Sequence, residues 1–203
     1  MRIGLLADIH DDADRLAIVL AQLDRQQVDQ IVALGDTLTG MRDVDATGVV
    51  GLLRDANVIG VWGNHDFGLC HGVTEEVRGL FDPSVLDFMG TLQPQIELDS
   101  CFFSHVEPWL DPHDIMQLWY YDGPPDTPKK AARSFEAVPN RFLFLGHFHH
   151  WLLMTPNGQI PWQGTEPIRL GDWERCLIIV APVFEGHCAV FDTERTELTP
   201  LQC

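Results

Sequence analysis

Residues 58–66 read VIGVWGNHD, an apolar run that ends in Gly63, Asn64, His65 and Asp66. A short apolar run bounded by glycine is typical of a strand that is buried on both faces. A simple polar turn has no need of a histidine between an asparagine and an aspartate. This stretch therefore predicts a buried strand that ends at a functional site.

Four other apolar runs end in the same way. The runs that begin near residues 5, 31, 101 and 142 lead respectively into Asp8 and His10, into Asp36, into His105, and into His147 and His149. Ligands of open α/β sheets bind at the carboxyl ends of the strands. We therefore expect these side chains and Asn64 to form one cluster, although they are far apart in the sequence.

The expected cluster combines imidazole, carboxylate and amide groups, which suits Mn, Fe, Zn, Co or Ni better than Ca. Asp-x-His and His-x-His place two donors on the same side of an extended segment, because side chains alternate with a period of two. Glycine precedes the donors at Gly35, Gly63 and Gly146, where it permits a tight turn and a close backbone approach. The predicted metal donors are Asp8, His10, Asp36, Asn64, His105, His147 and His149.

Taken singly, most of these motifs have an ordinary structural explanation. Asp8-x-His10 alone is more often a turn or a helix cap, and a Gly-Asp pair after a strand is commoner still. The string GHFHH at 146–150 is as easily a surface cluster, and His105 alone is more easily structural. The metal hypothesis therefore depends on the joint occurrence of the motifs, all of them at strand ends.

The chain reads as an α/β domain. Residues 12–26 have apolar residues at helical spacing, with Asp11 or Asp12 as the N-cap, and a second helix is predicted over 43–55. The predicted strands of this part are 2–7, 31–34, 57–62, 101–104 and 142–145. Alternating strands and helices predict buried strands in a layered fold.

The last fifty residues read differently. Strands over 151–154, 159–162, 176–181 and 188–192 are joined by turns, and we expect them to be mostly antiparallel. Residues 107–130 are rich in proline and aromatic residues, which predicts a long surface loop or a short cap.

Length and composition limit the function classes. A chain of 203 residues predicts one domain over 1–203. A net charge of −17 disfavours long nucleic acid, whereas a small phosphorylated substrate is compatible because bound cations reverse the local sign. Five cysteines without a CxxC pair are read as reduced thiols. With neither a signal peptide nor a run of about 20 apolar residues, we expect a cytoplasmic protein that does not bind membranes. The oligomeric state stays open.

Together the motifs point to a known family. The ordered set Asp8-x-His10, Gly35-Asp36, Gly63-Asn64-His65-Asp66, His105 and Gly146-His147-x-His149 resembles the calcineurin-like metallophosphoesterase superfamily. It is most similar to the small single-domain bacterial and archaeal phosphodiesterases, over residues 1 to about 150. The resemblance implies an α/β (α+β) fold with a two-sheet β-sandwich flanked by helices, in four layers αββα. It also implies a dinuclear metal site that hydrolyses phosphomonoesters or phosphodiesters.

The resemblance also assigns roles. Asp8, His10 and His149 would bind a first metal, Asn64, His105 and His147 a second, and Asp36 would bridge both. His65 would be a catalytic residue near the leaving group, with Asp66 orienting it. The sequence departs from the family where valine follows His105 in place of the usual glycine, and where 163–167 replace the expected turn.

These roles predict a metal-dependent phosphoesterase that acts on a small phosphodiester or phosphomonoester, such as a nucleotide. Two divalent ions ~3.5–4 Å apart, with manganese favoured, would lower the pKa of a bridging water toward ~7, and the hydroxide would attack phosphorus. His65 would stabilise or protonate the leaving oxygen. A hydrogen bond from Asp66 would fix the His65 tautomer.

Other functions remain open. One is a protein or dinucleoside-polyphosphate phosphatase, and another is a catalytically inactive scaffold that binds a protein partner. A scaffold has no need of His65, which argues against it. A metallo-β-lactamase-like hydrolase needs an HxHxDH string, which residues 146–151 do not supply.

Several residues lie outside this scheme. Trp109, Trp119, Tyr120 and Tyr121 can form an apolar wall on which a nucleobase stacks, although packing is the commoner role of such residues. Arg42 can contact phosphate or simply be solvated, and His150 adjoins the last donor pair.

Overall fold

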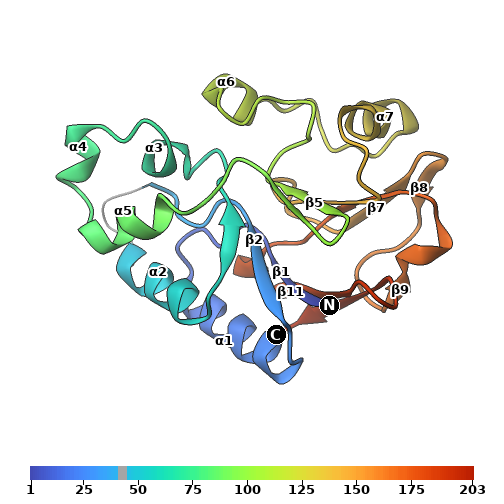
Figure 1. The fold of residues 1–203 in the computed structure, drawn as a ribbon, viewed down its shortest axis with the longest axis horizontal. Coiled ribbons are helices and arrows are strands. Elements are labelled where there is room, and N and C mark those ends of the chain that lie inside the picture. Colours follow the sequence, from blue (N-terminus) through green and yellow to red (C-terminus); the bar gives the residue numbers. More distant parts are fainter. Residues whose placement is uncertain (41–44) are drawn as a thin grey trace.

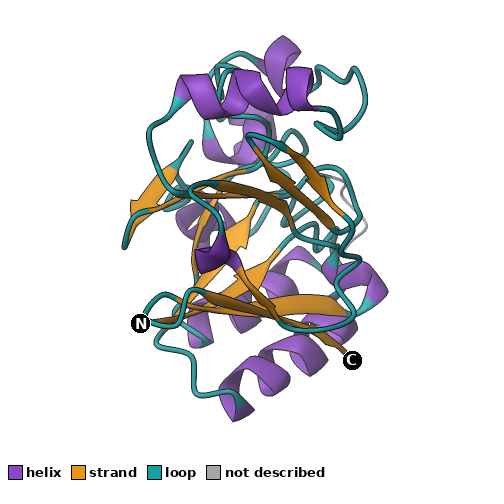
Figure 2. Ribbon diagram, turned by 90° about the vertical axis from the view of Figure 1, so that its right-hand side faces the viewer, coloured by secondary structure: helices purple, strands orange, loops and turns teal. Residues whose placement is uncertain are grey.

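The computed structural model describes residues 1–40 and 45–203. Two mixed six-stranded sheets lie face to face, and helices cover both outer faces, as Figures 1 and 2 show. The predicted four-layer α/β architecture is therefore confirmed.

Both sheets combine strands from distant parts of the chain. In spatial order, the first contains β3 (Ile59–Val61), β2 (Gln30–Leu34), β1 (Arg2–Leu6), β11 (His187–Asp192), β12 (Glu197–Gln202) and β9 (Ile168–Arg169). The second contains β4 (Ile96–Leu98), β5 (Cys101–Ser104), β6 (Phe142–Leu145), β10 (Cys176–Ile179), β7 (Leu152–Thr155) and β8 (Gly158–Ile160). The C-terminal strands thus complete both sheets.

The helices lie outside the two sheets. They are α1 (Ala13–Arg25), α2 (Ala46–Asp55), α3 (Phe67–Cys70), α4 (Glu75–Arg78), α5 (Pro83–Met89), α6 (Ile115–Leu118) and α7 (Pro128–Ala137). Two 3-10 turns, η1 (Leu170–Asp172) and η2 (Val183–Glu185), follow later in the chain. In Figure 1, α1 and α2 lie below the first sheet, and α6 and α7 lie above the second.

Side chains of each strand alternate between a core shared by the two sheets and a core between that sheet and its helices. Ile3 and Leu5 of β1 face the other sheet, where they meet residues such as Phe144 of β6. Leu6 faces the opposite way, into the cluster that α1, α2 and α5 close. On the second sheet, Leu143 packs toward α7. Burial on both faces explains why these strands read as continuous apolar runs.

The parallel strands direct the site residues to one rim. β1, β2 and β3 run parallel in the first sheet, and β5 and β6 run parallel in the second. Two hydrogen bonds join the sheets where these strands end. The His147 amide donates to the Asp8 carboxylate at 3.2 Å, and His105 Nδ1 lies 2.8 Å from the Leu34 carbonyl oxygen.

The predicted elements agree with the structure where the apolar pattern is strong. The strands 101–104 and 142–145 are confirmed residue for residue, and Asp12 is the N-cap of α1. The second helix begins at Ala46, because Asp45 caps it; residues 43 and 44 lie outside the described part. The strand predicted over 57–62 is too long, since β3 covers only three residues.

Other predictions need correction or addition. The C-terminal strands are mostly antiparallel, as predicted, but β10 also pairs in parallel with β6. Strands β4, β9 and β12 and the helices α3 to α6 were not among the predicted elements. Short elements such as β9 and α3 show too few repeats of a period. Residues 107–130 form a cap that contains α6 and the start of α7. Within the described residues, no helix has the length and apolar character that crossing a bilayer requires.

We predict that Gly51→Ala stabilises the protein. Gly51 lies inside α2, and a Cβ atom there would meet nothing within 4 Å. Alanine in a helix interior is favoured over glycine by about 0.5–1 kcal/mol. Urea unfolding of the metal-free protein should show this gain in the free energy of unfolding.

Gly48→Ala in the same helix is the matched control. A Cβ atom at Gly48 would lie 2.2 Å from Oδ2 of Asp45, whose side chain caps the helix. Losing that cap costs about 1 kcal/mol and cancels the gain. Equal stabilisation by both substitutions would contradict this account of the N-terminus of α2.

Candidate metal centre

The structure brings all seven predicted donors together at the rim. Donor atoms of Asp8, His10 and His149 lie within 4.8 Å of one another, and so do those of Asp8, Asp36 and His105. A third such group contains His10, Asp36 and His65. Asp8, His10 and Asp36 each belong to two of the three groups, so the groups overlap and form one continuous cluster.

Asp36 lies between two sets of donors. Its Oδ2 atom is 3.7 Å from His10 Nε2 on one side and 3.4 Å from His105 Nε2 on the other. In the first set, His149 Nε2 lies 3.4 Å from both His10 Nε2 and Asp8 Oδ1. A single carboxylate therefore adjoins both sets.

The second set converges on Asn64. Oδ1 of Asn64 lies 3.0 Å from His105 Nε2 and 3.0 Å from His147 Nδ1. Because His105 Nδ1 donates to the Leu34 carbonyl, the neutral His105 ring turns a lone pair toward the carbonyl oxygen of Asn64. Among the described residues, the buried Nε2 atom of His147 has no hydrogen-bond partner. Three side chains whose donor atoms converge at a buried place, one of them carrying this Nε2 atom, fit a divalent metal.

Electrostatics within the cluster also fit a cation. Burial disfavours a charge on His105, but the Asp36 carboxylate outweighs it and raises the His105 pKa to about 9. In turn, burial disfavours a charge on Asp36, yet the His105 imidazolium holds the Asp36 pKa well below its usual range. Without metal, the proton on His105 thus occupies the place of a cation.

The other histidines of the cluster differ in charge. Burial, followed by the positive charge of His105, lowers the His147 pKa to about 3. Burial also lowers the His10 pKa. A hydrogen bond to Asp8 raises the His149 pKa. His147 and His10 are therefore neutral near pH 7 and available to a metal.

Five of the predicted donors have left-handed backbone, as do six other non-glycine residues of the described part of the chain. Positive φ angles occur at Asp8 (52°), His10 (49°), Asp36 (52°), His147 (69°) and His149 (56°). A left-handed conformation costs a non-glycine residue about 1–2 kcal/mol. Such strain gathers at functional sites, where the surrounding structure enforces it.

Two glycines allow the donors to approach the backbone. A Cβ atom at Gly63 would lie 2.1 Å from Asp36 Oδ1, and one at Gly35 would lie 2.6 Å from His105 Nδ1. Gly35 also has φ of 90°. The close approach expected at these positions is therefore present.

The expected role of Asp66 needs correction. Its buried carboxylate accepts hydrogen bonds from the backbone amides of Thr37 (3.1 Å), Leu38 (3.0 Å) and Gly63 (2.9 Å). None of the hydrogen bonds in the described part of the chain joins it to the His65 ring. Burial and then the Asp36 charge raise the Asp66 pKa to about 7. Asp66 therefore fastens together the loops that carry Asp36 and Asn64.

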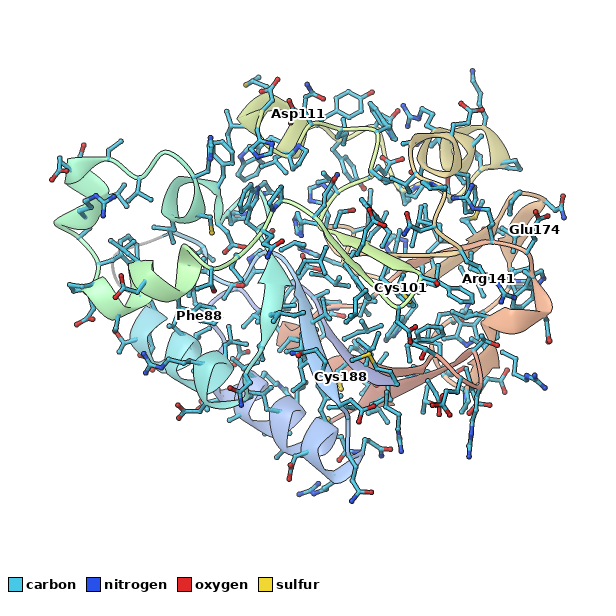
Figure 3. All side chains as sticks on the ribbon, in the orientation of Figure 1. Phe88, Cys101, Asp111, Arg141, Glu174 and Cys188 are labelled. Atoms are coloured by element: carbon cyan, nitrogen blue, oxygen red, sulfur yellow. The ribbon has the colours of Figure 1, made fainter. Side chains whose placement is uncertain are left out.

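His65 is held by other contacts. Its amide donates to Asp36 Oδ1 at 3.0 Å. Its ring lies edge-on to His10, with centroids 5.1 Å apart, and to Trp119, at 4.9 Å. Trp119 belongs to the cap, whose Asp111 is labelled at the top of Figure 3.

Phe184 adjoins the site and was not predicted from the sequence. Its ring in η2 lies 5.6 Å from the His10 ring and 5.2 Å from the His149 ring. No motif surrounds it, so no local signal could have indicated it. Among the other candidates, His150 is exposed and its Nδ1 lies 2.7 Å from the Phe148 carbonyl oxygen, whereas Arg42 lies outside the described residues.

The comparisons with known proteins agree with this fold. The calcineurin-like phosphoesterase superfamily domain matches residues 1–162. No curated protein matches the chain. Among solved structures, a metallophosphoesterase from Sphaerobacter thermophilus is 21% identical, with a TM-score of 0.77 over 100% of this chain and 88% of that one.

Two further structures are similar at lower scores. An archaeal phosphodiesterase is 14% identical, with a TM-score of 0.59 over 100% of both chains. A phosphoesterase from E. coli is 18% identical, with a TM-score of 0.52 over 95% of this chain and 88% of that one. At these identities the structures demonstrate a shared fold.

We predict that metal binding releases protons. Near pH 7 His105 is protonated in the metal-free protein, because its pKa is about 9, and a metal at Nε2 must displace that proton. Calorimetric titration of Mn²⁺ in buffers of different ionisation enthalpy should show release of at least one proton. The apparent affinity should rise about tenfold per pH unit between about pH 6 and 8. An affinity independent of both buffer and pH would show that His105 is already neutral.

We also predict that Asp66→Ala is strongly destabilising. The substitution leaves three buried amides without an acceptor, at about 1 kcal/mol or more each, so the free energy of unfolding should fall by about 3 kcal/mol. Urea unfolding near pH 8, where Asp66 is ionised, measures this. His65→Ala is the control and should cost less than about 1 kcal/mol. Equal stability of the two variants, together with equal loss of turnover, would restore the role of Asp66 as the group that orients His65.

Proposed function

Because the chain belongs to the calcineurin-like phosphoesterase superfamily, we propose that it hydrolyses phosphoric esters with two divalent cations held in the Asp, His and Asn cluster. Asp8, His10 and His149 would hold the first cation, and Asn64, His105 and His147 the second. The observation that supports this most is the position of Asp36, whose Oδ2 atom adjoins both sets of donors.

The two cations would neutralise charge on the phosphoryl oxygens and supply a water of lowered pKa. The protein positions the two sets of donors and the proton donor. Asp36 fixes the spacing of the two donor sets, and Asp66 holds the loops beneath them. His65 is partly buried beside His10 and is suited to donate a proton to the departing oxygen.

We propose a small phosphorylated substrate, a phosphodiester or a phosphomonoester, and manganese as the preferred metal. The net charge of −17 opposes a long polyanion, whereas two bound cations favour a single phosphoryl group at the rim. We expect that the protein acts on neither long nucleic acid nor membranes. The cytoplasmic location stays a prediction.

We predict that His65→Ala loses turnover and keeps its metals. Removing a proton donor from the leaving group typically costs about 100-fold or more in kcat. Chromogenic phosphomonoesters and phosphodiesters assayed with Mn²⁺ measure turnover, and elemental analysis of the purified variant measures metal content. Unchanged turnover would remove His65 from the reaction, and loss of metal would make it a ligand.

Asp36→Asn is the matched variant, which should lose metal as well as turnover. It keeps the shape of the side chain but removes the charge that both cations share, so metal content and turnover should fall together. Chelation of the unmodified protein should have the same effect. Two tightly bound cations without hydrolysis of any ester would favour the scaffold alternative.

A further inference from the structure

The four aromatic residues of the cap divide into two pairs. Trp109 and Tyr120 pack together with centroids 5.6 Å apart, and the Arg133 guanidinium lies 4.1 Å from the Trp109 ring. Tyr120 also donates to Asp122 at 3.3 Å. Trp109 therefore has the usual packing role, and Tyr120 packs against it although 43% of Tyr120 is exposed.

Trp119 and Tyr121 have a different environment. Their side chains are 52% and 63% exposed, although both are large and apolar. The Trp119 ring meets the His65 ring at 4.9 Å and 64°, and the Tyr121 ring lies 6.1 Å from the His147 ring. Both exposed rings therefore border the candidate metal centre.

Ionic contacts hold the cap in this position. Arg133 of α7 lies 3.7 Å from Glu107 and 3.3 Å from Asp122. Glu107 is buried and follows the donor His105 by two residues. The cap is thus joined to the strand end that carries a donor, so the two exposed rings have a defined place beside the cluster.

We propose that Trp119, with Tyr121 two residues further along the chain, binds an aromatic ring carried by the leaving group of the substrate. This rests on the proposed function, in which His65 faces the leaving oxygen. Trp119 meets His65 at a steep angle and is half exposed, so part of its indole surface is free to stack. An aromatic side chain stacks on any nucleobase, which suits a nucleoside or aryl leaving group.

The chemistry of the rim supports this occupant. A phosphoryl group bound at the cation cluster would place its leaving oxygen beside His65. The part of the leaving group next to that oxygen would then meet the Trp119 ring, which contacts His65. The stacking surface and the cation cluster would then bind different parts of one molecule. Such a site distinguishes esters by their leaving group.

The test compares adenosine 5′-monophosphate with ribose 5-phosphate, and the methyl diester of each. Within each pair the same phosphoryl group is bound and the same bond is broken, and only the base differs. Dissociation constants are measured calorimetrically on Mn²⁺-loaded His65→Ala protein, and kcat/KM on the unmodified protein. We expect adenosine 5′-monophosphate to bind about tenfold more tightly than ribose 5-phosphate.

Three substitutions assign the effect to the ring. Trp119→Ala should bring the ratio of the two dissociation constants close to one, whereas Trp119→Phe keeps a ring and should retain most of the preference. Met116→Ala, which removes a 76% exposed side chain of the same cap, should leave the ratio unchanged. Circular dichroism and the melting temperature verify that each variant is folded.

Equal affinity for the two ligands, or a preference that survives Trp119→Ala, would overturn the proposal. A dimer that dissociates on Trp119→Ala, with the ratio unchanged, would assign this surface to a second copy of the chain and also overturn it. Failure of the proposed function has a different signature, because none of the four esters would then be hydrolysed. Turnover of both members of a pair at equal kcat/KM would contradict the stacking site alone.

Discussion

The rest of the structure depends on lone pairs that face one another at a buried rim. His105 Nε2 lies 3.4 Å from Asp36 Oδ2 and 3.0 Å from Asn64 Oδ1. Such an arrangement is repulsive unless a cation occupies it, and in the metal-free protein the His105 proton meets that need. The cluster is thus built for positive charge before any metal binds.

Holding these donors together is costly, and the framework offsets the cost. Left-handed backbone at donors such as Asp8 and His147 is unfavourable, as is a buried Asp66 carboxylate. The three amide hydrogen bonds to Asp66 and the bonds between the two sheets keep the rim in place. The two apolar cores on either side of each sheet stabilise the strands from which the rim projects. The free energy gained by apolar burial in the layers therefore offsets the backbone strain at the site.

The superfamily accounts for the layers of the fold, and aromatic side chains surround the donor cluster. The cap positions Trp119 against His65, and η2 positions Phe184 against His10 and His149. Phe184 lies beyond the residues that the superfamily domain matches. Aromatic side chains thus border the candidate site from two separate segments.

The sequence by itself determined the buried strands, because burial on both faces is a local property, and it indicated the candidate donors through their joint occurrence at strand ends. A strand covered on both faces must be apolar throughout, as 101–104 and 142–145 are, and metal donors are limited to a few residue types. Only the tertiary structure decided the role of Asp66, the place of Phe184 and which of the cap aromatics border the donor cluster. Each of these depends on which side chains meet across sheets and loops. Such meetings leave no periodic pattern in the chain, since the partners are separated by tens of residues.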